Sequence, residues 1–148
     1  MNPNATISEI LSHKGSTAWS ISPEATVFEA IQMMADKNVG ALLVTENDRL
    51  VGIISERDYT RKIVIKGKAS RTTAVKEILS SQVIHVTPSH TVEECMRLMT
   101  DHHFRHLPVL EGDRIAGIVS IGDLVNWIIS AQTSTISQLQ TYITGVPA

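Results

Sequence analysis

The chain contains an internal repeat with a register of 65 residues, and this repeat constrains the fold more than any other feature. Residues 22–63 align with residues 87–128 without a gap, and 16 of the 42 aligned pairs are identical. Upstream, Glu9-Ile10-Leu11-Ser12 recurs as Glu77-Ile78-Leu79-Ser80 with an offset of 68. The sequence therefore predicts a tandem duplication in which the first copy carries a longer N-terminal connection.

Each copy spans about 60 residues, which is short for an independent domain. We therefore expect the two copies to complete one core together, as a pseudo-twofold pair. The expected boundaries are residues 6–70 for the first repeat, 71–130 for the second, and 131–148 for a C-terminal helical extension and tail.

Both copies predict the same order of elements, β-α-β-β-α, and hence an α/β (α+β) fold. Thr26 and Thr91 each precede a glutamate by three residues, which is the spacing of a helix capping box, and apolar residues follow at helical intervals. Two short apolar runs separated by a polar turn then predict a hairpin in each copy. A short strand is expected before each first helix, over residues 18–21 and 83–86.

A long final helix is predicted over residues 122–144, since glycine and proline follow it. It carries an apolar stripe after the second copy is complete, consisting of Ile136, Leu139, Tyr142 and Ile143. Such a stripe either docks on its own domain or packs on a partner, and the stripe alone leaves both arrangements open.

Composition narrows the classes of function. The net charge of −2 argues against nucleic acid as a partner, because nucleic-acid-binding domains are usually basic. The single cysteine, Cys95, excludes an internal disulfide and a zinc site built from several thiolates. Neither a signal peptide nor an apolar run of about 18 residues is visible, so a cytoplasmic protein with no membrane partner is expected.

The sequence Gly-h-h-Ser-x-x-Asp, where h is apolar, ends the predicted hairpin of both copies, at residues 52–58 and 117–123. Glycine in a strand permits close approach of a ligand or another backbone. Serine is a natural helix cap, and the N–H groups at a helix start suit phosphate oxygens. The aspartate can accept hydrogen bonds from the two hydroxyls of a ribose. The alternative is a capping box alone, but the recurrence in register favours a binding site.

The duplicated order and this motif resemble the tandem CBS domain pair, named after cystathionine β-synthase, over about residues 6–130. The run Arg105-His106-Leu107-Pro108-Val109 is also similar to that family, and residues 136–143 are similar to the tail of small bacterial proteins that consist of little but a CBS pair. The resemblance implies clefts between the copies that bind an adenosine-containing ligand such as AMP, ADP, ATP or NAD. S-adenosylmethionine is less expected, and no metal is required. The resemblance also implies a homodimer, and the additional apolar stripe near the C-terminus favours the same expectation.

The resemblance also implies roles for individual residues. The ribose would be held by Asp58 and Asp123, and the hydroxyls of Ser55 and Ser120 would lie near ribose or phosphate. Further candidates are, for phosphate, Arg57, Arg105 and His106 and, for adenine, Ile21, His85, Val86 and Pro108.

The two copies differ at the phosphate positions, because Arg57 corresponds to Gly122 and Arg105-His106 correspond to Gly40-Ala41. With twofold exchange, the cleft of Asp58 would also receive Arg105 and His106. We therefore expect it to bind a phosphorylated nucleotide more tightly than the cleft of Asp123 does.

The expected function is that of a regulatory adenine-nucleotide-binding module that signals ligand occupancy to a protein target or through its own assembly. Catalysis is not expected, because the sequence has no nucleophile paired with a base, no P-loop lysine and no paired catalytic carboxylates. One alternative is a ligand-free scaffold for protein interaction or dimerisation. A second alternative is a protein that binds nucleic acid, and the acidic charge balance disfavours this alternative.

Overall fold

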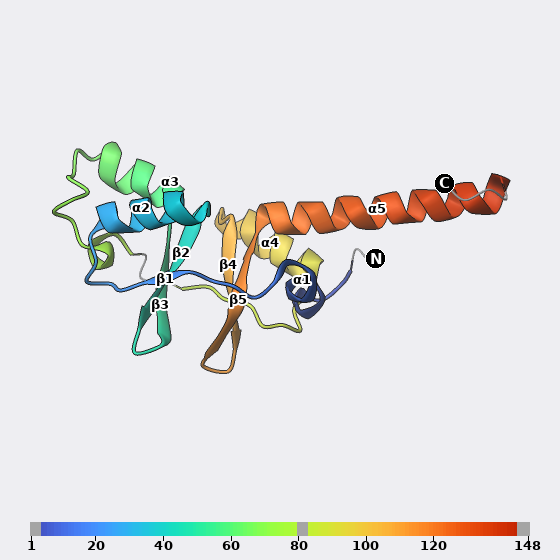
Figure 1. Ribbon diagram of the computed structural model, residues 1–148, viewed down its shortest axis with the longest axis horizontal. Helices are drawn as coiled ribbons and strands as arrows, with labels where there is room; N and C mark the ends of the chain where they lie inside the picture. The colour runs from blue at the N-terminus through green and yellow to red at the C-terminus, as the bar shows by residue number, and fades with distance from the viewer. Residues whose placement is uncertain (1–3, 80–82, 145–148) are drawn as a thin grey trace. The chain divides into compact units, whose positions relative to one another are not determined.

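The computed structural model describes residues 4–79 and 83–144, without the side chains of residues 133–135, 137–138 and 141–144 (Figure 1). The chain divides into two compact units. Unit 1 consists of the described parts of Met1–Ser16, Val86–Val109 and Ala116–Ala148, and unit 2 of the described parts of Thr17–His85 and Leu110–Ile115.

Unit 2 contains a three-stranded sheet with the order β1-β2-β3, formed by β1 (Ser20–Ile21), β2 (Ala41–Glu46) and β3 (Arg49–Ser55). Strand β2 pairs parallel with β1 and antiparallel with β3. The helices of this unit are α2 (Val27–Lys37), the single turn α3 (Glu56–Asp58), the π-helix η1 (Tyr59–Val64) and the 3₁₀-helix η2 (Val75–Ile78). The core lies between the sheet and these helices and includes Val27, Met34, Leu42, Ile54 and Ile63.

Unit 1 contains α1 (Ile7–Lys14), α4 (Val92–His102), the hairpin strands β4 (His106–Glu111) and β5 (Arg114–Ser120), and the long helix α5 (Ile121–Thr144). The tip of the hairpin, Leu110–Ile115, belongs to unit 2. Helix α5 packs on α1 and α4. The two short strands predicted ahead of the first helices are shorter than expected. One is β1, and the other is reduced, among the described residues, to a parallel bridge between Val86 and Val109.

The first helix of each copy begins at the threonine cap that the sequence predicts. Thr26 and Thr91 accept hydrogen bonds from the amides of Glu29 and Glu94, both at 3.1 Å. The C-terminal caps of α2 and α4, Asn38 and His103, adopt left-handed backbone conformations with φ of 55° and 59°. These local signals depend on residues three or four apart, which explains why the sequence was sufficient to place both helices.

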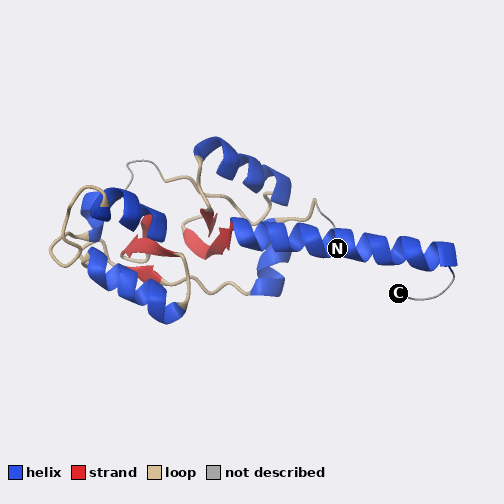
Figure 2. Ribbon diagram, turned by 90° about the horizontal axis from the view of Figure 1, so that it is seen from above, coloured by secondary structure: helices blue, strands red, loops and turns tan. Residues whose placement is uncertain are grey.

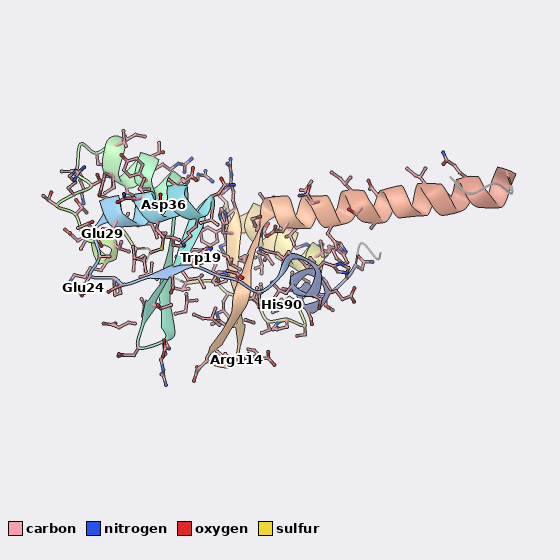
Figure 3. All side chains as sticks on the ribbon, viewed as in Figure 1. Trp19, Glu24, Glu29, Asp36, His90 and Arg114 are labelled. Atoms are coloured by element: carbon pink, nitrogen blue, oxygen red, sulfur yellow. The ribbon has the colours of Figure 1, made fainter. Side chains whose placement is uncertain are left out.

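The segment that precedes each repeat packs in the unit of the other repeat. The Ile7 amide donates to the His90 carbonyl at 2.8 Å, and the Val75 amide donates to the Ala25 carbonyl at the same distance. Figure 3 shows His90 beside α1. The donors Ile7 and Val75 are equivalent residues of the two copies by the offset of 68, and the acceptors are equivalent by the offset of 65. The packing of each segment with the other repeat therefore follows the internal symmetry of the sequence. Helix α1 thus completes the unit built from the second repeat, and η2 completes the unit built from the first.

Candidate functional site

Both Ser-x-x-Asp sequences form complete capping boxes. In unit 2 the Ser55 amide donates to Asp58 Oδ2 at 2.9 Å, and the Asp58 amide donates to Ser55 Oγ at 3.3 Å. In unit 1 the Ser120 amide donates to Asp123 Oδ2 at 2.8 Å, and the Asp123 amide donates to Ser120 Oγ at 3.1 Å. The side chains of Asp58 and Asp123 are 26% and 25% exposed. Each aspartate therefore has the capping role and still reaches solvent, so capping does not preclude ligand binding.

Some of the backbone amides at the two helix starts are already hydrogen-bonded within the protein. They are therefore not available to a phosphate. The Glu56 amide donates to the Gly40 carbonyl at 3.1 Å, and the Ile121 amide donates to the Arg105 carbonyl at 2.8 Å. With the Asp58 and Asp123 amides bound to serine hydroxyls, two amides at each start are already engaged by the protein. A bound phosphate would therefore rely mainly on cationic side chains.

A lysine lies against the aspartate of unit 1. Lys14 Nζ, at the end of α1, is 2.7 Å from Asp123 Oδ2 and also donates to the Ile118 carbonyl at 2.7 Å. Partial burial opposes ionisation of Asp123, but the hydrogen bonds from Lys14 and from the Ser120 amide and the charge of Lys14 outweigh it. Together they hold the pKa of Asp123 below its ordinary value. Asp123 is therefore an anion with a tightly bound internal counterion at neutral pH.

A lysine also lies against the aspartate of unit 2, but it comes from another element. Lys62 Nζ, on η1, is 3.3 Å from Asp58 Oδ1 and donates to the carbonyl of Ile78, the last residue of η2, at 2.9 Å. Lys62 follows Asp58 by four residues, a spacing that brings side chains together on a helix. Each lysine thus links the motif's hairpin or helix to the exchanged segment, α1 in unit 1 and η2 in unit 2.

The motif glycines accommodate leucine side chains. A Cβ added at Gly52 would lie 3.0 Å from Leu79 Cδ2, and one added at Gly117 would lie 3.0 Å from Leu11 Cδ2. Leu11 and Leu79 are equivalent residues of the two Glu-Ile-Leu-Ser segments. The sequence predicted close approach by a ligand or a backbone at these glycines. The group that approaches both is instead a side chain of the exchanged segment.

The residues assigned by resemblance are distributed over both units. Unit 2 holds Ile21, Ser55, Arg57, Asp58 and His85, and unit 1 holds Val86, Arg105, His106, Pro108, Ser120 and Asp123. Each Ser–Asp pair is brought together by its capping box. Because Arg105 and His106 belong to a different unit from Asp58, their grouping with it stays a prediction.

The exposures of these residues differ. Arg57 and His106 are half-buried, and Arg105 and His85 are exposed. Ile21 and Val86 are 8% and 0% exposed, and Pro108 is also buried, so these three side chains belong to the core. Their predicted contact with adenine stays untested.

Sequence reasoning missed the two lysines as members of the site. Lys14 is 109 residues from Asp123 in sequence, and no local pattern connects them. Lys62 was visible only as part of a basic stretch, although its spacing of four from Asp58 is a signal that could have found it.

Within residues 4–79 and 83–144, no group of three or more histidine, cysteine, aspartate or glutamate side chains could hold a metal ion. No helix in that part of the chain is both long and apolar enough to cross a membrane.

Cys95 is fully buried on α4, and burial, together with the neighbouring Glu94, raises its pKa to about 12. This cysteine packs as a small apolar residue, as its position on the core face predicted.

Comparison with known proteins supports the resemblance. The family model described as "CBS domain" matches residues 16–65 and 75–130. The chain is 39% identical over 152 residues to the CBS domain-containing protein CBSX3, mitochondrial, of Arabidopsis thaliana, a match that covers 96% of this chain and 73% of the relative. A solved structure described as a putative signal-transduction protein with CBS domains from Burkholderia ambifaria is 45% identical, with a TM-score of 0.83 over 86% of this chain and 96% of that one.

A more distant structure shows the same fold. It is the CBS domain pair of protein MJ0100 in complex with 5′-methylthioadenosine and S-adenosyl-L-methionine, 21% identical, with a TM-score of 0.77 over 87% of this chain and 99% of that one. The family model covers both repeats, and the mixed α/β fold matches the tandem CBS architecture. The chain belongs to the CBS domain family and contains a tandem pair of these domains.

Proposed function

We propose that this chain is a regulatory module that binds an adenosine-containing ligand such as AMP, ATP or NAD and transmits the occupancy of its sites to a protein target or to its own assembly. The observation that carries the proposal is the recurrence of a surface-accessible aspartate, Asp58 or Asp123, at the same helix start in both repeats of a CBS pair. The ligands of the distant MJ0100 pair belong to the same chemical class. In this role the chain is a sensor rather than an enzyme.

The two lysines couple ligand binding to the conformation of the protein in this proposal. A ribose hydroxyl that donates to Asp123 competes with Lys14, which is held 2.7 Å away and belongs to α1. Displacing the ammonium group weakens the link between α1 and the Ser120–Asp123 turn. In unit 2 the same competition at Asp58 involves Lys62, which also holds the end of η2. Ligand binding is therefore proposed to change how firmly each exchanged segment is attached.

The two sites are proposed to differ in affinity. Arg57 precedes Asp58, whereas Gly122 precedes Asp123, so only the first site has a cation within its own helix start. Lys14 is also closer to Asp123 than Lys62 is to Asp58, 2.7 Å against 3.3 Å, so a hydroxyl competes less easily there. A charge-assisted hydrogen bond to phosphate contributes roughly 1.5–3 kcal/mol. We therefore expect AMP to prefer the Asp58 site by a factor of ten or more.

Calorimetry with AMP, ATP, NAD and S-adenosylmethionine tests the proposal on the wild type and on Asp58→Ala and Asp123→Ala. The matched control is Glu94→Ala, which removes the same type of capping-box bond at the start of α4, where no ligand is proposed. We expect Asp58→Ala to abolish the tighter AMP site, Asp123→Ala to abolish the weaker one, and Glu94→Ala to leave both. Absence of binding by all four ligands to the folded wild type would instead favour the ligand-free scaffold.

A further inference from the structure

Residues 59–76 concentrate the positive charge of this chain. They include six of its 13 lysine and arginine residues and no aspartate or glutamate, whereas the remaining residues include seven basic and all 15 acidic side chains. Lys62 and Lys76 pair with acidic residues, and Arg71 lies over the Phe28 ring. The other three are exposed and make no ion pair among the described residues: Arg61, Lys66 and Lys68. This part of unit 2 therefore presents positive charge to solvent.

Two adjacent aliphatic side chains lie among these cations, at the end of η1. Val64 is 55% exposed and Ile65 is 73% exposed. The preceding residue, Ile63, is 1% exposed and belongs to the core of unit 2, so one side chain anchors this segment while the next two reach solvent. Apolar surface that is rimmed by charged residues is typical of a site where a partner binds.

Exposed aliphatic side chains also occur on α5, in different surroundings. Ile136 and Leu139 of the apolar stripe predicted from the sequence are both 56% exposed, so they do not dock on their own unit. The side chains of Tyr142 and Ile143 lie outside the described residues. After Asp123 the sequence contains no further aspartate, glutamate, lysine or arginine. The stripe therefore offers no charge by which to identify a partner, whereas the surface at the end of η1 does.

The backbone that carries the exposed pair is fixed by a helix-ending pattern of hydrogen bonds. The Lys68 amide donates to the Ile63 carbonyl at 3.0 Å. The Gly67 amide donates to the Val64 carbonyl at 3.2 Å, and Gly67 adopts a left-handed conformation with φ of 69°. These are the two bonds and the glycine of a Schellman motif, which ends a helix in one defined geometry.

The loop that follows is fixed to the start of α2. The Phe28 amide donates to the Ser70 carbonyl at 3.0 Å, and the Val27 amide donates to the Thr73 carbonyl at 2.8 Å. The Arg71 guanidinium lies 3.9 Å from the centre of the Phe28 ring. Figures 1 and 2 show this loop at the edge of unit 2, between η1 and η2. Because both ends of the loop are held, the exposed groups are positioned before a partner arrives, which lowers the entropic cost of binding.

The chemistry of this surface favours an acidic segment of another protein as the occupant. Exposed ammonium and guanidinium groups complement carboxylates, and the aliphatic pair between them complements an apolar side chain of the same segment. Anionic membranes are usually bound by amphipathic helices with tryptophan, phenylalanine or leucine on the apolar face, and two aliphatic residues fall short of that. Single-stranded nucleic acids stack their bases on aromatic side chains, and residues 60–76 contain none.

The surface also adjoins the ligand site proposed in unit 2, because η1 carries Lys62, whose ammonium group is 3.3 Å from Asp58 Oδ1. We propose that the protein target of this module docks through an acidic segment on the surface formed by Arg61, Val64, Ile65, Lys66 and Lys68. Carboxylates of the segment bind the three cations, and an apolar side chain covers the aliphatic pair. This inference rests on the proposed function, since it names the partner that receives the signal, but the docking itself requires no nucleotide.

Peptide binding to the full chain without nucleotide tests the surface. The probe is a fluorescein-labelled synthetic peptide of four Glu-Glu-Leu triplets, followed by fluorescence anisotropy, and a peptide of Gln-Gln-Leu triplets is its control. We expect saturable binding of the acidic peptide that weakens as salt is added, and binding of the glutamine peptide that is weaker by about tenfold or more. Lys66→Glu combined with Lys68→Glu should weaken binding of the acidic peptide by about tenfold or more, and Ile65→Ser by about threefold, because it removes an apolar contact.

The matched control reverses the same number of charges elsewhere. Arg49→Glu combined with Arg114→Glu alters two exposed arginines at the hairpin tips and leaves the surface at the end of η1 intact. We expect this variant to bind the acidic peptide within about twofold of the wild type, because salt screens charges at a distance. Circular dichroism and thermal denaturation should show that both double variants stay folded, since all four substituted side chains are exposed.

Absence of peptide binding by the folded wild type would overturn the proposal, as would equal binding of the glutamine peptide or equal weakening by the two double variants. Vesicles of phosphatidylcholine with one quarter phosphatidylglycerol provide the last arm. Cosedimentation of the chain with these vesicles, without peptide binding, would identify a lipid surface as the occupant instead. Failure of the proposed function shows separately, as absence of nucleotide binding in calorimetry. Peptide binding that persists in that case would support the docking surface and remove only its link to a nucleotide signal.

Discussion

The motif aspartates of the two units have the same local environment but receive their counterions from different elements. In unit 1, Lys14 comes from the exchanged helix α1 and reaches back to Asp123 and to a carbonyl of β5. In unit 2, Lys62 comes from the helical segment of Asp58 itself and reaches out to a carbonyl of the exchanged η2. In unit 1 the residue equivalent to Lys62 is Trp127, four residues after Asp123. Trp127 is buried and packs edge-on against His13 of α1.

This difference separates the features that the two copies share from those that only one copy has. The cap, the glycine and the leucine that fills the space above it occur at equivalent positions in both copies. The lysines do not, yet both connect the motif to the exchanged segment. Two lysines at non-equivalent positions thus make the same kind of connection in the two units. The link in unit 1 is the tighter, and the following substitutions test that ranking.

The largest expected difference concerns the two motif glycines. Alanine at either position brings a methyl group to 3.0 Å from a leucine methyl, a crowding that costs about 1–3 kcal/mol in a packed site. Gly117 also has φ of +157°, which side-chain-bearing residues rarely adopt, whereas Gly52 does not have a positive φ. We expect Gly117→Ala to lower the free energy of unfolding by about 2–4 kcal/mol and Gly52→Ala by about 1–2 kcal/mol. Urea denaturation measures both, and equal losses would contradict the ranking.

The next difference concerns the lysines themselves. Lys14→Met removes two hydrogen bonds of 2.7 Å, one of them to a charged partner, from side chains that are less than a third exposed. We expect a loss of about 1–2 kcal/mol in the free energy of unfolding. Lys62→Met removes a hydrogen bond of 2.9 Å to the Ile78 carbonyl and a contact of 3.3 Å to Asp58 from a side chain that is 35% exposed, so we expect a smaller loss of about 0.5–1 kcal/mol. Amide hydrogen exchange should show faster opening of α1 in Lys14→Met. A larger loss for Lys62→Met would reverse the comparison.

The caps should behave alike. Ser55 and Ser120 make the same reciprocal bonds with their aspartates, so alanine at either position should cost about 1 kcal/mol, with a difference below about 0.5 kcal/mol. Thermal denaturation of the two variants measures this. A clear inequality would mean that the repeats differ in their local structure as well as in their counterions.

The sequence was sufficient for features that depend on close neighbours or on the repeat itself. The caps at Thr26, Thr91, Ser55 and Ser120 and the two hairpins were all predicted, because each is specified within a few residues. The exchange of α1 and η2 was not predicted. The recurrence of Glu9-Ile10-Leu11-Ser12 shows that two segments are equivalent, but not that each packs with the other copy. Pairing across 109 residues, as between Lys14 and Asp123, depends on the packed fold and leaves no local trace.

The smallest expected effect is a pH dependence of stability in unit 1. The pKa of Asp123 is lowered in the folded protein, with Lys14 as a principal cause. A carboxylate with a lowered pKa stabilises the fold at pH values above its unfolded pKa of about 3.9, and it loses that contribution as the pH falls through the folded value. The difference in unfolding free energy between the wild type and Lys14→Met should therefore be constant between about pH 6 and 8 and should shrink as the pH falls below about 4. Lys14→Arg, which keeps the charge, should retain most of the wild-type pH dependence. Urea denaturation of the three proteins across this range measures the effect, and a difference that persists undiminished in acid would show that Lys14 acts through its bond to the Ile118 carbonyl rather than through Asp123.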